Sequence, residues 1–161
     1  MYRKIVKLMI SAFLFSAFIG CDYFAAGSNL MAERYEYEVS KDSLMQKINT
    51  FNILNGVKLE GHTFKISKNN PNFYRGTIYD HGTDESYIVL IPKPIEPPTS
   101  LLLVSLIDNK SGKIIIVNQK PSNNQEIIDR GVVIRKFEDR ILDKLGLEYH
   151  HTGNAMNKKY E

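Results

Sequence analysis

The stretch that decides the fold is residues 73–91, which read FYRGTIYDHGTDESYIVLI. Its two ends, Phe73–Tyr79 and Ser86–Ile91, are rich in the aromatic and β-branched residues that favour extended strands. Residues 80–84 between them supply the aspartates and the glycine that tight turns favour. The stretch therefore predicts two neighbouring antiparallel strands joined by a short turn.

Further strands are predicted on both sides of this hairpin. Residues 92–99 contain four of the six prolines, which cannot donate to a sheet and so predict an extended loop or a strand edge. Leu101–Ile107 and Lys113–Val117 flank the turn sequence DNKSG and predict a second hairpin. Upstream, Leu59–Ser67 predicts a strand that ends at the turn-forming sequence KNNPN.

One strand and one helix are predicted before these strands. From Arg34 onward, Tyr35, Tyr37 and Val39 alternate with two glutamates, as in a half-exposed strand. Ser40 is a suitable N-cap for a helix over residues 41–54, whose apolar residues recur at helical spacing. Asn55-Gly56 is expected to end this helix, because glycine readily adopts the left-handed conformation there.

A second helix is predicted over residues 122–145. Ser122 and Gln125 have the spacing of a capping box, and apolar residues follow at helical intervals until Gly146. Gly131 is expected to delay or bend the helix, since glycine costs about 1 kcal/mol relative to alanine. Residues 148–161 are polar, and we expect them to form a frayed tail.

The predicted order of elements is β-α-β-β-β-β-β-α, which defines the fold class. Helices are few and the strands follow one another through short loops. A parallel doubly wound sheet would need a helix between most strands. We therefore predict an α+β fold with an antiparallel sheet of five to six strands and two helices packed on one face.

The N-terminus has the pattern of an export signal. Residues 1–7 are basic, and residues 8–19 form an uncharged apolar stretch of 12 residues. This stretch is shorter than the roughly 20 residues that span a bilayer. The chain's single cysteine, Cys21, follows directly after Gly20.

The segment Phe18-Ile19-Gly20-Cys21 resembles a bacterial lipobox, although Phe18 stands where that family usually has leucine. The resemblance implies a signal peptide over residues 1–20 and a membrane anchor made by acylation of Cys21, for example with palmitate. It also implies that residues 21–33 form a lipidated tether. The residue pattern of the remaining chain predicts a single domain over residues 34–147 and a polar tail over 148–161. The protein would face the periplasm or the outside, and Asp22 resembles the inner-membrane retention signal of enteric lipoproteins. An ordinary secretory signal or uncleaved anchor with an incidental thiol is the alternative.

The charge distribution argues against a nucleic-acid partner. Three of the 21 basic residues lie in the first 20 residues, which contain no acid, so the rest of the chain holds 18 basic and 18 acidic residues. The predicted second helix interleaves basic with acidic side chains, which is typical of a solvated helix face and not of a basic stripe.

Motifs of enzyme chemistry are missing from the sequence. It contains no glycine-rich phosphate loop after a strand, no Gly-x-Ser-x-Gly elbow and no cysteine pair, and we expect no cofactor. One local cluster has metal-capable side chains, namely Asp80, His81, Asp84 and Glu85. Because these residue types also suit a soluble hairpin turn, we expect a turn and no metal site. The adjacent His150 and His151 are expected to be solvated.

Tyrosines in the predicted strands suggest a recognition surface, since tyrosine offers a broad apolar area with a polar tip. The candidate surface comprises Tyr35, Tyr37, Tyr74, Arg75, Tyr79 and Tyr87. Routine packing of these tyrosines within the sheet is the alternative. Strands 101–107 and 114–117 are apolar on both faces and need cover on both, from the chain itself, a second copy or a partner.

The sequence thus favours a lipid-anchored, non-catalytic interaction protein of the cell envelope that binds an envelope protein. An immunity or inhibitor protein is one specific form of this hypothesis. Two alternatives stay open. One is a small envelope hydrolase or metal-dependent enzyme that uses the turn at Asp80–Glu85 with a distant His62 or His150. The other is a structural subunit of an envelope complex.

Overall fold

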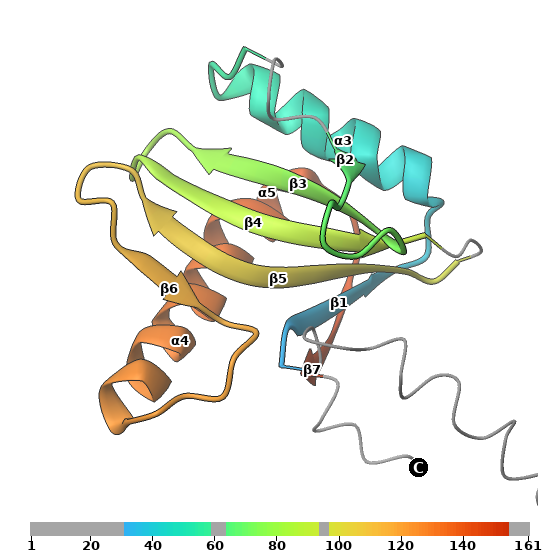
Figure 1. The fold of residues 1–161 in the computed structure, drawn as a ribbon. Helices are drawn as coiled ribbons and strands as arrows, with labels where there is room; N and C mark the ends of the chain where they lie inside the picture. Colours follow the sequence, from blue (N-terminus) through green and yellow to red (C-terminus); the bar gives the residue numbers. More distant parts are fainter. Residues whose placement is uncertain (1–30, 59–63, 94–96, 155–161) are drawn as a thin grey trace, which may run out of the picture.

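The structure, a computed structural model, describes residues 31–58, 64–93 and 97–154 of the 161-residue chain. The described elements are β1 (Glu33–Tyr37), α3 (Lys41–Leu54), β2 (Lys65–Ile66), β3 (Phe73–Asp80), β4 (Glu85–Pro92), β5 (Thr99–Asp108), β6 (Ile114–Ile116), α4 (Asn124–Phe137), the π-helical turn η2 (Glu138–Leu142), α5 (Asp143–Leu145) and β7 (His150–Asn154). All strand pairs are antiparallel, in the order β2-β3-β4-β5-β1-β7, with β6 also paired to β5 (Figure 1). The predicted α+β class and antiparallel sheet are confirmed.

Strands β3 and β4 form an antiparallel hairpin, as the sequence predicts. The two strands pair over their whole length, from Phe73 opposite Pro92 to Asp80 opposite Glu85. Asp84 has a φ of 59°, and its N–H donates to the carbonyl oxygen of Asp80 at 2.9 Å. Aspartate tolerates this left-handed conformation better than most residues, which explains its place in the turn.

Strand β5 pairs with two different strands along one edge. Its residues 99–103 pair with β1 and its residues 105–107 pair with β6. Between these two parts, Val104 forms a bulge relative to β4, and its carbonyl oxygen accepts the N–H groups of Val117 at 2.7 Å and Asn118 at 3.2 Å. The bulge separates the two segments, because the extra residue bends the strand and increases its twist.

Both helices pack on one face of the sheet and close the main core. Helix α3 buries Leu44 and Ile48 there, and α4 buries Val133 and Phe137. The strands contribute the inward-facing residues Tyr35, Tyr37, Ile78, Tyr87, Val89, Ile91, Leu101 and Leu103. Full burial of one large apolar side chain contributes about 1.5–3 kcal/mol, so this layer is the main source of stability.

The opposite face carries a second, smaller apolar cluster. Ala32, Phe73, Leu90 and Leu102 are buried there, and Val104 packs against them. The sheet therefore buries apolar side chains on both faces, as expected from its apolar central strands.

Side chains cap the N-termini of both helices, and one of the two predicted caps needs a correction. Ser40 caps α3 by accepting the N–H of Ser43 at 3.3 Å. The predicted box of Ser122 and Gln125 is wrong by one residue, because Asn123 is the N-cap and accepts the N–H of Glu126 at 2.9 Å. The Glu126 side chain also accepts the Ser122 N–H at 2.6 Å, one residue before the N-cap.

The second helix continues through Gly131 and changes character after Phe137. A π-helical turn over residues 138–142 links α4 to α5, and the chain leaves the helix at Gly146 with a φ of 64°. Ile141 and Leu142 are both buried although they are consecutive.

Within the described residues, no helix is long and apolar enough to span a membrane.

The C-terminal residues correct the prediction of a frayed tail. Residues 150–154 form β7, which pairs with β1 through a register shift between Arg34 and Tyr35. Backbone pairing requires no apolar side chain, so the polar composition of this segment did not reveal the strand.

The predicted strand Leu59–Ser67 is described only from residue 64 onward, where Lys65–Ile66 form β2.

A side chain from α3 completes the hydrogen bonding of β3 beyond the short β2. Asn52 is fully buried; its Nδ2 donates to the Thr77 carbonyl oxygen at 2.8 Å, and its Oδ1 accepts the Tyr79 N–H at 3.0 Å. The amide thus takes the place of a neighbouring strand's peptide group. It ties α3 to the edge of the sheet and occupies backbone groups that would otherwise be open to edge pairing.

Asn52→Ala should lower the free energy of unfolding by about 2–4 kcal/mol, because it leaves a backbone donor and acceptor without partners. Urea unfolding would measure this loss. Asn49→Ala is the matched control on the same helix, because Asn49 Oδ1 is buried without a hydrogen-bond partner in the described part of the chain. Similar losses for the two variants would contradict this role of Asn52.

Candidate functional site

The six residues of the predicted recognition surface do not share one surface. Tyr35, Tyr37 and Tyr87 have no exposed area, because strand alternation directs them toward the face that the helices cover. Tyr35 donates from its hydroxyl to Glu138 Oε1 at 3.2 Å, whereas the Tyr37 hydroxyl has no partner within the described ranges. Burial raises the pKa of all three phenols well above the usual range. These three tyrosines belong to the core.

The other three members of that predicted set point in different directions. Tyr74 is half-buried on the helix-covered face, with Lys41 Nζ 5.0 Å and Lys93 Nζ 5.8 Å from its ring centroid. Arg75 is exposed on the opposite face, as alternation requires. Tyr79 lies on that face too, and its hydroxyl donates to Asp84 Oδ1 at 3.1 Å.

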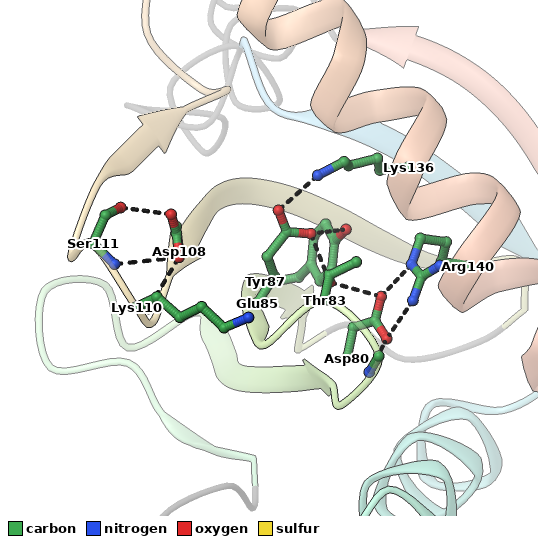
Figure 2. A network of polar contacts seen from close by, with 10 residues as sticks. Asp80, Thr83, Glu85, Tyr87, Asp108, Lys110, Ser111, Lys136 and Arg140 are labelled. Atoms are coloured by element: carbon green, nitrogen blue, oxygen red, sulfur yellow. Dashed lines mark hydrogen bonds and ion pairs between the residues drawn. The ribbon is translucent and has the colours of Figure 1, made fainter.

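The turn between β3 and β4 forms a polar network with the C-terminal helix (Figure 2). Asp80 accepts two hydrogen bonds from the Arg140 guanidinium, one of them from Nη2 at 3.0 Å. Glu85 accepts from Lys136 Nζ at 2.7 Å. The Thr83 hydroxyl lies between the two carboxylates, 3.0 Å from Asp80 Oδ2 and 2.8 Å from Glu85 Oε2. The turn is thereby fixed against the helix.

The charge of Asp80 is stabilised in this network. Burial opposes its ionisation, but hydrogen bonds from Arg140, Thr83 and the Gly82 N–H outweigh burial and hold the pKa of Asp80 below its usual range. A Cβ on Gly82 would lie 2.6 Å from Arg140 Nη2, so glycine allows the guanidinium to approach this closely. Asp80 acts here as an anionic anchor for Arg140.

The metal and enzyme alternatives required the turn residues to be available and to meet a distant histidine. Asp80 and Glu85 are engaged by Arg140 and Lys136, and His81 is exposed. His150 lies on β7, three strands away from β4 in the sheet, which is about 14 Å at ordinary strand spacing. His62 lies outside the described residues. Among the residues that are described, no group of three or more His, Cys, Asp or Glu side chains is arranged to hold a metal ion.

A second polar network, which the sequence did not suggest, surrounds His151. Its Nε2 is 3.0 Å from Glu33 Oε2, its Nδ1 is 2.9 Å from Glu138 Oε1, and its ring stacks on Tyr35 at 4.7 Å between centroids. Both contacts are hydrogen bonds when each ring nitrogen carries a proton. Glu33 also pairs with Arg130 at 3.0 Å. His151 is exposed, as the sequence predicts, and its ring also links β7 to β1 and η2.

The most unusual surface is that of α4, which exposes several large apolar residues although it buries an arginine. Its inward side carries Arg130 along with the apolar Val133 and Phe137. Its exposed side carries large apolar residues, with Ile127 at 54% and Ile128 at 58% of their full exposure. The exposed side also carries the charged residues Glu126 and Arg135, whereas an ordinary surface helix keeps its large apolar residues toward the core.

Strand β6, which lies beside α4 (Figure 1), adds further exposed apolar residues. Five of the eight large apolar residues exposed in the described part of the chain belong to these two elements, and we call them the α4–β6 surface: Ile114, Ile116, Ile127, Ile128 and Val132. A cleft of about 250 Å³ separates the two elements, and Lys113 bridges them by pairing with Asp129 at 3.1 Å. Clustered exposed apolar residues of this kind are typical of interaction surfaces.

Comparison with known proteins yields no relative: no family model, no curated protein and no solved structure matches the chain significantly.

Asp80→Asn should be less stable than the wild type at pH 7 by about 2–4 kcal/mol, because Arg140 loses its charged partner. The stabilisation from a carboxyl with a lowered folded-state pKa is present above its ordinary pKa of about 4 and is lost as the pH falls through the folded-state value. The wild type should therefore lose stability more steeply below about pH 4 than the variant does.

Urea unfolding across about pH 2–7 would test this expectation, with Asp139→Asn, an exposed neighbour of Arg140, as the control. Equal pH slopes for Asp80→Asn and the wild type would contradict it.

Proposed function

We propose that this chain is a lipid-anchored, non-catalytic binding module of the cell envelope, and that a partner protein docks on the α4–β6 surface. The observation that carries the proposal is the group of large apolar side chains that α4 and β6 expose. The exposed isoleucines of α4 lie outside the core clusters that the structure describes. Burial of such a surface against another protein would recover the apolar stabilisation that the isolated domain lacks.

The lipid anchor is supported by the sequence around Cys21, and the place where the chain enters the domain determines which surface the anchor would hold near the membrane. The Met31 carbonyl oxygen accepts from Arg130 Nη2 at 2.7 Å, so the chain joins the domain beside α4. The ten residues from Cys21 to Met31 can extend over at most about 35 Å. Acylation at Cys21 would therefore hold α4 near the membrane, which favours a partner located at the membrane.

The hydrolase alternative receives less support from the geometry. Its best candidate carboxylates, Asp80 and Glu85, are buried and paired with cations that the fold itself supplies. A general acid or base must reach the substrate proton directly or through one water. Both carboxylates instead hold the C-terminal helix against the hairpin.

Cys21→Ala should abolish incorporation of radiolabelled palmitate and release the protein from the detergent-dependent membrane fraction, because it removes the proposed acylation site. Ser28→Ala, in the predicted tether, is the control and should leave labelling unchanged. Metabolic labelling followed by membrane fractionation would measure both effects. Palmitate labelling that persists in Cys21→Ala would contradict the lipid anchor.

A photo-crosslinking amino acid at position 132 should capture a partner protein in intact membranes. The same group at position 54 should not, although Leu54 is 81% exposed on α3. Adding Ile128→Asp to the position 132 probe should reduce the adduct at least about tenfold by placing a charge in the interface. Leu54→Asp is the matched control, and since both residues are exposed, the Tm should change little.

The mass and origin of the adduct decide between the possible outcomes. A reproducible adduct that forms from position 132 and is lost with Ile128→Asp supports docking on the α4–β6 surface. An adduct of twice the chain's own mass would replace the partner protein by a second copy and contradict the proposal. Equal adducts from positions 132 and 54 would contradict it as well.

A further inference from the structure

A cleft of about 310 Å³ lies at the other edge of the sheet, where β2 pairs with β3 (Figure 1). Three cationic side chains line it, those of Lys65, Lys68 and Arg75. Ser67 and Thr77 add hydroxyl groups to the same lining. The cleft thus combines positive charge with neutral hydrogen-bond donors and has no acidic residue in its lining.

The cationic character of this edge extends along the chain. Between Gly61 and Tyr79 the sequence contains no aspartate or glutamate. No ion pair to Lys65, Lys68 or Arg75 occurs in the part of the chain that the structure describes. All three of these residues are exposed.

Two of the three cations are placed directly opposite each other. Lys65 on β2 and Arg75 on β3 are partners in the antiparallel register, so their side chains leave the same face of the sheet. Residues opposite each other in such a pair have Cβ atoms about 4.5–5.5 Å apart, and like charges at that separation are destabilising. An anion bound between them would convert this repulsion into attraction.

Protection of the sheet edge does not account for the whole arrangement. A lysine on an edge strand discourages pairing with other chains, and this explains Lys65. It does not explain Arg75, which lies on β3, one strand inside the edge and in register with Lys65. Protection of the edge requires one charge, whereas the structure places two like charges opposite each other.

We propose that this cleft binds a phosphate group carried by a small molecule or a lipid headgroup. Arginine presents a planar fork that matches two phosphate oxygens, and lysine adds a compact charge. The Ser67 and Thr77 hydroxyls suit the remaining oxygens. The cleft volume lies at the lower end of the range for small-molecule sites, so it has room for more than inorganic phosphate alone. This site is independent of the α4–β6 surface and of the lipid anchor.

The test uses the full-length protein, labelled with ¹⁵N, in micelles of an uncharged detergent. Inorganic phosphate at constant ionic strength should shift the amide resonances of residues 65–69 and 75–77 in a saturable manner, and chloride should not. Arg75→Gln should weaken phosphate binding about tenfold, as expected for the loss of a charge-assisted hydrogen bond. Lys144→Gln, an exposed lysine on α5, removes the same charge and should change affinity less than about twofold.

A second measurement addresses the repulsion directly. Lys65→Gln should raise the Tm at low ionic strength without phosphate, because it removes one of the two opposed like charges. It should also remove the stabilisation that phosphate gives to the wild type. A lower Tm for Lys65→Gln without phosphate would overturn the argument from the opposed cations.

Mixed micelles distinguish the two sources of the phosphate group. Shifts at the cleft with phosphatidylglycerol but not with phosphatidylcholine, in the absence of a response to inorganic phosphate, assign the site to an anionic lipid headgroup. A response to inorganic phosphate without one to phosphatidylglycerol assigns it to a soluble phosphorylated molecule, and responses to both support recognition of the shared group. No response to either, or equal weakening by Arg75→Gln and Lys144→Gln, would overturn the proposal.

Discussion

Three carboxylates on the helix-covered face of the sheet must be neutralised, and one helical segment supplies a cation for each. Glu33, Asp80 and Glu85 are all buried. Glu33 pairs with Arg130, Asp80 with Arg140 and Glu85 with Lys136. A buried carboxylate without a partner costs several kcal/mol, so the C-terminal helix has few positions in which it can pack. The orientation of this helix over β1 and over the β3–β4 turn therefore follows from charge pairing as well as from apolar packing.

This constraint bears on two features of the C-terminal helix. The π-helical turn places consecutive Ile141 and Leu142 in the core while Arg140 still reaches Asp80. The widened turn accommodates an extra residue, and such turns are frequent at functional sites. The outer side of α4 carries Ile128 and Val132 together with the exposed Arg135. The ion pairs fix which side of the helix faces the sheet, and these residues lie on the other side.

Much of the architecture could be predicted from local patterns, because turns, caps and period-two alternation are encoded by neighbouring residues. The β3–β4 hairpin and the Ser40 cap are examples. The face on which a residue lies relative to the helices is a tertiary property, so the alternation at Tyr35 and Tyr37 predicted a strand but not the burial of both rings. The same limit applies to β7, since its pairing with β1 joins residues more than 110 positions apart. The charges of α4 interleave along the chain, and only the packed structure separates those that face the sheet from those that face solvent.

Acidic and basic residues balance in number but are unevenly distributed over the fold. After the basic N-terminal segment the chain holds equal numbers of acidic and basic residues, which argues against long-range attraction to polyanions. Three acidic residues are buried in the fold, and the sequence contains no acidic residue between positions 61 and 79. A region rich in unpaired cations therefore remains at the β2 edge, opposite in the sheet order to the β1–β7 end. Local recognition of a small anion is compatible with a neutral domain, because at ordinary ionic strength charges interact mainly within about 8–10 Å.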